Sequence, residues 1–426
     1  MRVAEPTGRL RRLFFPGGRW FYGWNIVAAA GGLQMLAGML WMQSYGAYVV
    51  LLQEEFGWSK TLIAAAFALT RIESGILGPI QGWLVDRYGP KLILSIGTCM
   101  FGLGFMWFSR VDSLLEFYLA FGFIAVGSSL GGFATVMVAI VNWFNRHRSK
   151  AVAWSQLGYS VGGMAVPLVV LALEAWGWRA TAFLSGVVVL ILGLPMAQVV
   201  RHRPGPFGEL PDGEVISESE GPKQVVARDL SARQAMATSA FWLISFGHAS
   251  ALLTVSAMMV HLVAHLSEGL GYSLAAAAVM VTVVTGSQMV GQLLGGYLGD
   301  RFDKRYLSVA CMAAHAGALV GMAYASETWQ VVFYAVTHGL AWGIRGPLMV
   351  ALRADYFGAA AFGTIMGFSS LIVMLGMSLG PIIAGLMADA SGNYESGFTV
   401  LAAAAFLGGF CFLFAKPPER SSRPKV

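Results

Sequence analysis

The amino-acid sequence predicts an all-α integral membrane protein whose twelve transmembrane helices form two pseudo-symmetric bundles of six. Three observations predict this class: a strongly apolar composition, twelve apolar stretches of membrane-spanning length, and a loop motif that occurs twice, half a chain apart. Of the 426 residues, 57% are hydrophobic and 12% are charged. Soluble domains carry about 25% charged residues. Water is therefore not the main solvent of this chain.

The twelve apolar stretches are separated by short polar interruptions. Crossing ~30 Å of hydrocarbon takes about 20 helical residues, and the short alternating segments of a membrane β-barrel are absent from the sequence. We predict the spans at 24–52, 61–83, 92–109, 114–142, 151–173, 179–200, 239–265, 273–298, 306–324, 330–352, 363–388 and 395–415.

The longest polar stretch between these spans divides six of them from the other six. It runs over residues 201–238 and contains Pro204-Gly205-Pro206 and Pro211-Asp212-Gly213, both of which favour turns. We therefore expect an N-terminal six-helix bundle over residues 1–200, a cytoplasmic middle loop over 201–238, and a C-terminal six-helix bundle with a cytoplasmic tail over 239–426.

The positive charges predict the orientation of the chain in its membrane. Lys and Arg gather in alternate loops, at Arg19, Arg87, Lys91, Arg146, Arg148, Lys150, Arg201, Arg203, Arg301, Lys304 and Arg305. The opposite loops, such as 53–55 and 391–395, contain neither residue type. Because Lys and Arg are retained on the cytoplasmic side, we expect a multi-pass protein of the cell inner membrane with both termini in the cytoplasm.

Other classes of protein receive little support from the sequence. The net charge of +6 arises from bases in short loops between apolar runs, so no nucleic-acid partner is expected. Cys99, Cys311 and Cys411 lie inside apolar stretches without metal-ligand spacing. We find no Walker loop and no nucleophile elbow. The sequence therefore predicts no enzyme activity, no cofactor, no metal and no use of ATP.

The loop motif after the second span recurs after the eighth. Residues 82–91 (GWLVDRYGPK) are echoed by residues 296–305 (GYLGDRFDKR), 214 positions later. A half-chain repeat in a membrane protein indicates two related bundles with a substrate site between them near the bilayer midplane.

This motif resembles the loop signature of the major facilitator superfamily, G-x-L-x-D-R-x-G-x-K. The first copy matches it at Gly82, Leu84, Asp86, Arg87, Gly89 and Lys91, whereas the second copy has Asp303 where the signature has glycine. The segments 55–61, 143–148 and 392–394 further resemble the monocarboxylate and oxalate–formate porter branch of that superfamily.

The resemblance implies transport by alternating access, with helices 1, 4, 7 and 10 lining the path. It also implies a cytoplasmic gate, in which Asp86, Arg87 and Arg148 make ion pairs that hold the outward-open state. Asp300 and Arg301 are the corresponding gate residues in the second copy of the loop motif. The alternative is a positive loop that serves only to orient the chain. Because isolated surface ion pairs are weak, only a network of them would shift the equilibrium between the outward-open and inward-open states.

Three Arg or Glu side chains lie deep within predicted spans, where each is a functional hypothesis. Arg345 is on the tenth span and offers a permanent, forked cation to a carboxylate. Helical spacing places His338, Ala341 and Trp342 on its face, so we predict that Arg345 and Trp342 bind substrate. The alternatives are pairing with Glu73 or hydrogen bonds to carbonyls near Pro347.

Arg71 and Glu73 share the second span and point about 200° apart. For Arg71, substrate contact and structural pairing both remain open. Glu73 is the candidate for proton coupling, with a fixed ion-pair role as its alternative.

Two further side chains on path-lining helices are candidate substrate contacts. His261 serves as a neutral donor or pH-sensitive group, or packs at the membrane interface; with His265 it has metal-binding spacing but lacks further ligands. Tyr45 donates its hydroxyl to an anion or packs against helix 7.

The chain departs from the branch pattern in its basic residues. Porters of this branch usually have a basic residue in helix 8, and the oxalate–formate type has a second in helix 11. Here helix 8 offers Gln288 and Gln292, and helix 11 has no basic residue. This difference argues against oxalate exchange.

We therefore expect a secondary active transporter of a small organic anion, above all a monocarboxylate, working by proton symport or exchange as a monomer in the lipid bilayer. The alternatives are a multidrug-type exporter of the same superfamily and a non-transporting membrane sensor on the same fold.

Overall fold

The structure is a computed structural model that describes residues 13–15, 19–58, 60–213 and 229–418. Within these ranges the chain is helical and forms no strand. It divides into two compact units. The first comprises Met1–Ala227 together with Phe362–Thr364, and the second comprises Arg228–Ala361 and Ile365–Val426.

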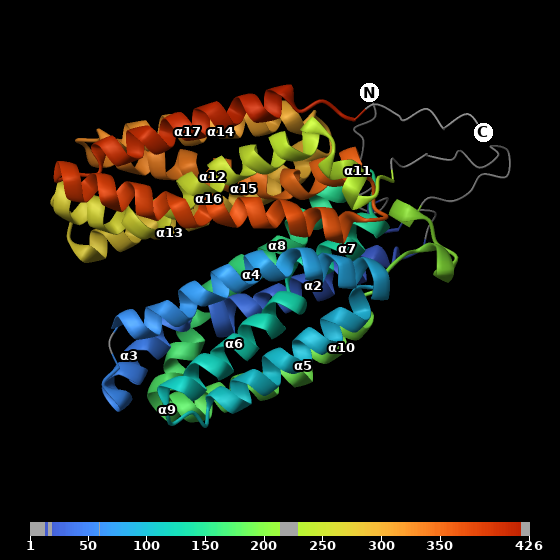
Figure 1. The fold of residues 1–426 in the computed structure, drawn as a ribbon, viewed down its shortest axis with the longest axis horizontal. Helices are drawn as coiled ribbons and strands as arrows, with labels where there is room; N and C mark the ends of the chain where they lie inside the picture. Colours follow the sequence, from blue (N-terminus) through green and yellow to red (C-terminus); the bar gives the residue numbers. More distant parts are fainter. Residues whose placement is uncertain (1–12, 16–18, 59, 214–228, 419–426) are drawn as a thin grey trace, which may run out of the picture. The chain divides into compact units, whose positions relative to one another are not determined.

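The first unit contains the helices from α2 to α10 (Figure 1). Their bounds are α2 Gly23–Ala37, the π-helical turn η2 Gly38–Met42, α3 Tyr45–Phe56, α4 Lys60–Tyr88, α5 Pro90–Phe108, α6 Leu114–Leu130, α7 Phe133–Trp143, α8 Arg148–Met164, α9 Val166–Val188, the π-helical turn η3 Val189–Gly193 and α10 Leu194–Val199, followed by the short turns η4 Gly205–Phe207 and η5 Pro211–Gly213.

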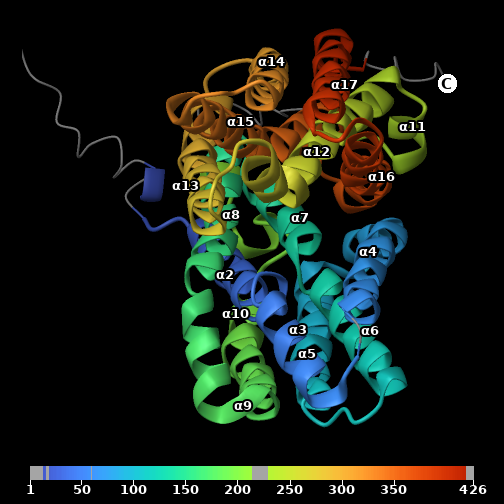
Figure 2. The same ribbon diagram turned by 90° about the vertical axis from the view of Figure 1, so that its left-hand side faces the viewer.

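The second unit contains the helices from α11 to α17, in which α14 lies beside α15 and α17 (Figure 2). Their bounds are α11 Ala232–Met236, α12 Ser239–Ala264, the π-helical turn η6 His265–Gly269, α13 Leu274–Gly299, α14 Lys304–Ala323, α15 Thr328–Phe357, α16 Phe362–Ser391 and α17 Glu395–Phe414.

Many of these helices can cross a membrane. Among the described residues, nine helical segments are long and apolar enough to do so. One of them, Arg148–Val199, has 52 residues and turns at Gly177, whose φ of +76° is a conformation that glycine adopts without strain. The long helices α4 and α15 carry the predicted intramembrane charges and are not among the nine. The chain is therefore a multi-pass membrane protein.

Close helix packing explains part of the high glycine content. In the first unit α2 packs on α8, and a Cβ added to Gly158 would collide with the backbone of Gly31. In the second unit α13 packs on α15, and a Cβ added to Gly343 would collide with the backbone carbonyl of Gln288. Small residues at such crossings let two backbones approach.

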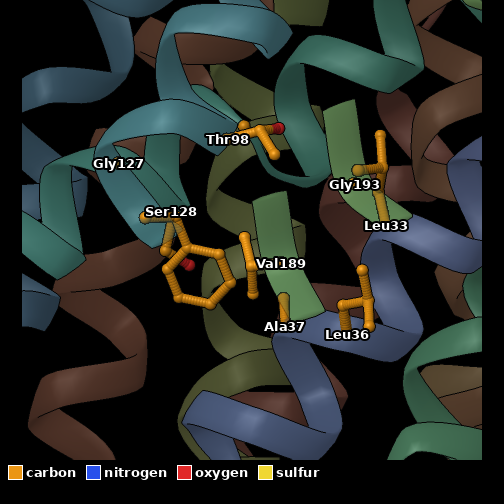
Figure 3. A pocket seen from close by; sticks show the side chains of 10 residues that line it. Leu33, Leu36, Ala37, Thr98, Gly127, Ser128, Val189 and Gly193 are labelled. Carbon is orange, nitrogen blue, oxygen red and sulfur yellow. The ribbon is translucent and has the colours of Figure 1, made fainter. Parts of the chain in front are cut away.

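The interior of the first unit is tightly filled where α2, α5, α6 and η3 meet (Figure 3). The gap there has a volume of about 10 Å³ and is lined by residues such as Leu36, Thr98 and Val189. A cavity needs roughly 10–15 Å³ to hold one water molecule. This place is a packing defect and has no room for a substrate.

The structure explains why the second copy of the loop motif departs from the signature. In the first copy Gly89 has a φ of +84° and Pro90 begins α5. In the second copy Asp303 has a φ of −63°, and its carboxylate accepts a hydrogen bond of 2.8 Å from the backbone N–H of Arg305. Asp303 thus caps α14 by a side-chain hydrogen bond, and glycine is not required.

Candidate functional site

The deepest charged group in the second unit is Arg345 on α15. Its side chain is 1% exposed, and its Nε and Nη1 atoms are buried without a hydrogen-bond partner. These two nitrogens therefore bond no carbonyl near Pro347, in contrast to one alternative drawn from the sequence. Ionised groups are very costly to bury without a partner, and guanidinium does not lose its proton in proteins.

Arg353 lies on the same helix, is equally buried, and is fully bonded. Its Nε and Nη2 donate to the Ser369 hydroxyl at 3.0 and 2.7 Å, and its Nη1 donates to the Met349 carbonyl at 2.8 Å. Nη2 also lies 3.1 Å from Nδ1 of His248 on α12. The two arginines therefore differ in bonding although both are 1% exposed.

Two histidines lie beside Arg345. His315 on α14 and His338 on α15 are 0% and 1% exposed, and their Nδ1 atoms are 3.2 Å apart. Nε2 of His315 is buried without a partner. The charge of Arg345 acts on both rings and on His248. Sequence analysis placed His338 on the face of Arg345 but missed His315, because nothing in the sequence pairs α14 with α15.

We call His248, Cys311, His315, His338, Arg345 and Arg353 the arginine–histidine cluster. Within the described part of the chain, no carboxylate pairs with either arginine. Helix packing brings the residues of the cluster together. Gly339 and Gly343 of α15 face α13, and α14 also packs on α15. Trp342, half-buried on α15, packs against the apolar core of the unit. The cluster offers unused N–H donors and positive charge, which suit an anion.

In the first unit a cavity of about 290 Å³ lies between α4 and α6 and includes Glu73 in its wall. Oε2 of Glu73 accepts hydrogen bonds from the hydroxyls of Ser74 at 3.1 Å and Ser129 at 3.4 Å, whereas Oε1 is buried without a donor. Ligand pockets start at roughly 300 Å³, so this space suits a small molecule.

Tyr45 packs against a residue that lines this cavity. Its ring centroid is 5.1 Å from that of Phe121, which lines the cavity together with residues such as Thr70 and Tyr118. The structure thus brings Tyr45 and Glu73, predicted from separate spans, to one part of the first unit. The backbone of Arg71 lies in α4, but its side chain is outside the described residues.

His261 is held by the helices that pack on α12. Its Nε2 lies 2.9 Å from the Pro381 carbonyl, and its ring centroid is 5.1 Å from that of Tyr394. His265 is held separately, with Nε2 2.9 Å from the Met322 carbonyl. Each imidazole therefore donates to a backbone carbonyl of a different helix. A role for His261 in substrate binding stays a prediction.

The predicted gate residue Asp86 bonds to the first turn of α16, in the short segment that groups with the first unit. Its Oδ1 accepts from the N–H of Gly363 at 2.9 Å, and its Oδ2 accepts from the N–H and hydroxyl of Thr364, both at 2.7 Å. A carboxylate at a helix N-terminus is favourable because the free N–H groups and the helix dipole attract it. Burial nevertheless raises the pKa of Asp86, against the lowering effect of Thr364.

The other predicted gate residues have different surroundings. The exposed guanidinium of Arg87 lies 5.7 Å from the ring centroid of Trp83 on its own helix. Arg148 is 7% exposed and donates from Nε to the Phe144 carbonyl at 2.9 Å. Asp300 is the C-cap of α13, and Arg301 lies 3.8 Å from the ring centroid of Tyr297.

Two aspartates of the middle loop have roles that the sequence alone does not indicate. The Asp212 carboxylate accepts from the backbone N–H groups of Asn145 at 2.9 Å, Arg146 at 2.7 Å and His147 at 3.2 Å. Oδ1 of Asp229 accepts from the N–H groups of Ala359 at 3.0 Å and Ala360 at 3.1 Å.

Each aspartate binds a turn of its own unit: Asp212 binds the turn after α7 in the first unit, and Asp229 binds the turn after α15 in the second. The turn signal at Pro211-Asp212-Gly213 is visible in the sequence. The partners of the carboxylates are not, because backbone N–H groups leave no mark in a sequence.

Comparison with known proteins gives a family and a fold. The model of the Major Facilitator Superfamily matches residues 30–262 and 244–426. Monocarboxylate transporter 11 of Homo sapiens is 26% identical over 413 residues, covering 93% of this chain and 83% of that protein. The oxalate:formate antiporter of Oxalobacter formigenes is 24% identical over 436 residues, covering 99% and 96%. The crystal structure of the E. coli fucose:proton symporter superposes with a TM-score of 0.71 at 13% identity, covering 92% of this chain and 98% of that one.

Proposed function

The chain belongs to the Major Facilitator Superfamily, and from this premise we propose that it is a secondary active transporter of a small organic anion, above all a monocarboxylate. Relatives that match most of its length are a monocarboxylate transporter and an oxalate:formate antiporter. They are transporters, and this chain is not an enzyme. The names of these relatives support an anionic substrate, while the missing basic residues of helices 8 and 11 argue against oxalate.

The observation that carries the proposal is the unpaired guanidinium of Arg345. Two of its nitrogens lack a partner, and no carboxylate accompanies the two arginines among the described residues. Buried charges are normally paired. A substrate carboxylate would supply the missing negative charge and accept hydrogen bonds from the guanidinium. Because Arg345 is 1% exposed, we propose that a conformational change of the transport cycle exposes it to the substrate.

The first unit supplies the other proposed elements of transport. Glu73, with one carboxyl oxygen free of donors beside a cavity, is a candidate for proton coupling, and Tyr45 and Arg71 are candidate contacts. Asp86 is the proposed gate, because its hydrogen bonds to the first turn of α16 can exist in one conformation and break in another. We further propose an inner-membrane location with both termini cytoplasmic.

Flux measurements in proteoliposomes test this function. We expect vesicles containing the purified protein to exchange labelled lactate, acetate or sulfoacetate across the membrane without ATP. An inward proton gradient should drive accumulation of the same anion if protons are coupled. Protein-free vesicles control for passive leak of the protonated acids. A requirement for ATP, flux only of amphipathic drugs, or no flux for any organic acid would contradict the proposal.

A further inference from the structure

The contact between His315 and His338 leaves one buried nitrogen unused. Each neutral imidazole carries one N–H, so a hydrogen bond between two Nδ1 atoms at 3.2 Å requires one ring to donate and the other to accept. In either arrangement Nε2 of His315 lacks a partner. It is then either a lone pair without a donor or an N–H without an acceptor. Buried polar groups of this kind are rare and costly.

The surroundings of the pair determine its protonation. Arg345 on α15 acts on both rings. Around Arg345 lie further titratable or charged groups: His248 from α12, Cys311 from α14 and Arg353 from α15. Helix α13, which packs on α15, has no charged residue within its bounds, and α17, which packs on α14, contributes Cys411 and, at its first residue, Glu395. Among the described residues, the charge that acts on the rings is therefore positive. A third positive charge on the histidine pair is disfavoured while the site contains no anion.

We infer that His315 and His338 form a proton-binding pair that couples proton uptake to the binding of an anion at Arg345. This inference rests on the proposed function and names its coupling site. A carboxylate beside Arg345 brings a negative charge that favours a positive charge on the neighbouring ring. By thermodynamic linkage, a bound proton must then strengthen anion binding by the same factor. Anion and proton consequently bind and leave together.

The proton balance of the pair is simple. One proton from water joins the pair and converts one of its two neutral rings into imidazolium, while the other ring stays neutral. If His315 takes the proton, its Nδ1–H donates to His338, and the positive charge lies beside the anion that is bound at Arg345. When the anion leaves, the repulsion from Arg345 returns and the proton is released to water. No group other than the substrate anion and a proton is needed.

This inference competes with Glu73 as the coupling group. Glu73 lies in the first unit with its own serine partners, and no described cation is bonded to it. The histidine pair, in contrast, shares its cluster with the proposed anion-binding arginine. Replacing one group at a time therefore separates the two assignments.

The test compares exchange with proton-driven accumulation in proteoliposomes containing full-length protein and labelled lactate, a monoanion whose transport with one proton moves no net charge. With one proton per anion, a gradient of one pH unit should drive about tenfold accumulation by the wild-type protein. We expect His315→Gln to retain exchange but to lose accumulation and the pH dependence of exchange. His265→Gln is the matched control, because it removes a buried histidine of the same unit that is bonded to a carbonyl. We expect it to behave as wild type.

The outcomes separate this inference from the proposed function. Absence of exchange by the wild-type protein contradicts the proposed function itself. If the wild-type protein exchanges the anion and His315→Gln still accumulates it along the proton gradient, the assignment of the histidine pair as the coupling site is wrong. The assignment is also wrong if Glu73→Gln loses accumulation while His315→Gln is unaffected. Loss of both exchange and accumulation in a folded His315→Gln protein also overturns it, because the residue then serves binding. If His315→Gln does not insert, His338→Gln breaks the same hydrogen bond and is judged by the same criteria.

Discussion

Glu55, near the end of α3, bonds to residues that lie far from it in the sequence. Glu55 accepts hydrogen bonds from the Trp178 indole and from Nη2 of Arg179 at 2.8 Å, and Arg179 also bonds Asp112 at 2.9 Å. The hydrogen bond from Trp178, followed by that from Arg179, lowers the pKa of Glu55. In the sequence Glu55 is visible only as part of the resemblance to the porter branch, because Trp178 and Arg179 are more than a hundred residues away.

We predict that Glu55→Gln lowers the thermal stability of the protein at neutral pH. A carboxyl whose pKa is lower in the folded protein contributes stability above its unfolded pKa, and this contribution disappears as the pH falls through its folded pKa. The pair with Arg179 is 37–40% exposed, so the effect should be about 1 kcal/mol or less.

Melting curves of wild type and Glu55→Gln between neutral and acid pH check this prediction. The two midpoints should converge as the solution becomes acidic. Glu54→Gln removes the same charge one residue earlier and serves as the control. A constant difference between wild type and Glu55→Gln at all pH values would show that packing, and not the carboxylate charge, is responsible.

Among the connecting elements, the middle loop is held by hydrogen bonds in both of its described segments, 201–213 and 229–238. Asp212 binds the turn after α7 and Asp229 binds the turn after α15. Asp212 does so with a φ of +60°, the only positive φ of a non-glycine residue among those described. Such a conformation is uncommon and costs free energy, so the hydrogen bonds of the carboxylate must offset it.

We predict that each aspartate protects only its own turn. In Asp212→Asn, backbone amides of residues 145–147 should exchange hydrogen faster, while those of residues 359–360 stay unchanged; Asp229→Asn should show the reverse. Asparagine tolerates a positive φ, so the change removes charge-assisted acceptors without new strain. The two variants are each other's control in one hydrogen-exchange experiment. Faster exchange at both turns in either variant would show that the loop unfolds as a whole.

The sequence predicts the helices better than their irregularities. Apolar stretches locate most helices of the described chain within a few residues, because the bilayer requires long apolar runs. The predicted span 24–52 is interrupted by the π-helical turn Gly38–Met42 before α3 begins at Tyr45. Such breaks depend on contacts with neighbouring helices, as where Gly38 meets the backbone of Tyr159. These contacts cannot be derived from local residue pattern.

At the scale of the whole molecule, the repeated loop motif was sufficient to identify the superfamily, and the family match confirms it. The candidate site was only partly predictable. Arg345, His338 and Glu73 are conspicuous in sequence because ionisable groups rarely occur within spans. His315 and Ser129 are on other helices. Only tertiary packing shows that His315 is a neighbour of Arg345 and that Ser129 is a neighbour of Glu73.

We predict that replacing Arg345 and replacing Arg353 have opposite effects on the melting temperature and different effects on anion binding. Removing Arg345 should remove a buried charge with two unsatisfied nitrogens, and an unsatisfied buried donor costs about 1–3 kcal/mol. Arg345→Gln should therefore raise the melting temperature of the empty protein and weaken anion binding by about 2–5 kcal/mol, the usual cost of losing one partner of a buried charged pair. Arg345→Lys keeps the charge but loses the fork, so some binding should survive.

Thermal shift of the purified protein with lactate, acetate and sulfoacetate tests this claim most directly, since a ligand that binds the folded state raises its melting temperature. The matched control is Arg353→Gln, which breaks the bonds to Ser369 and Met349 and should lower the melting temperature while the response to the anion persists. We predict that Arg345→Gln melts above wild type without anion and does not respond to it. A folded Arg345→Gln protein that responds to the anion as wild type does would contradict the assignment of Arg345 as the counter-ion of the substrate.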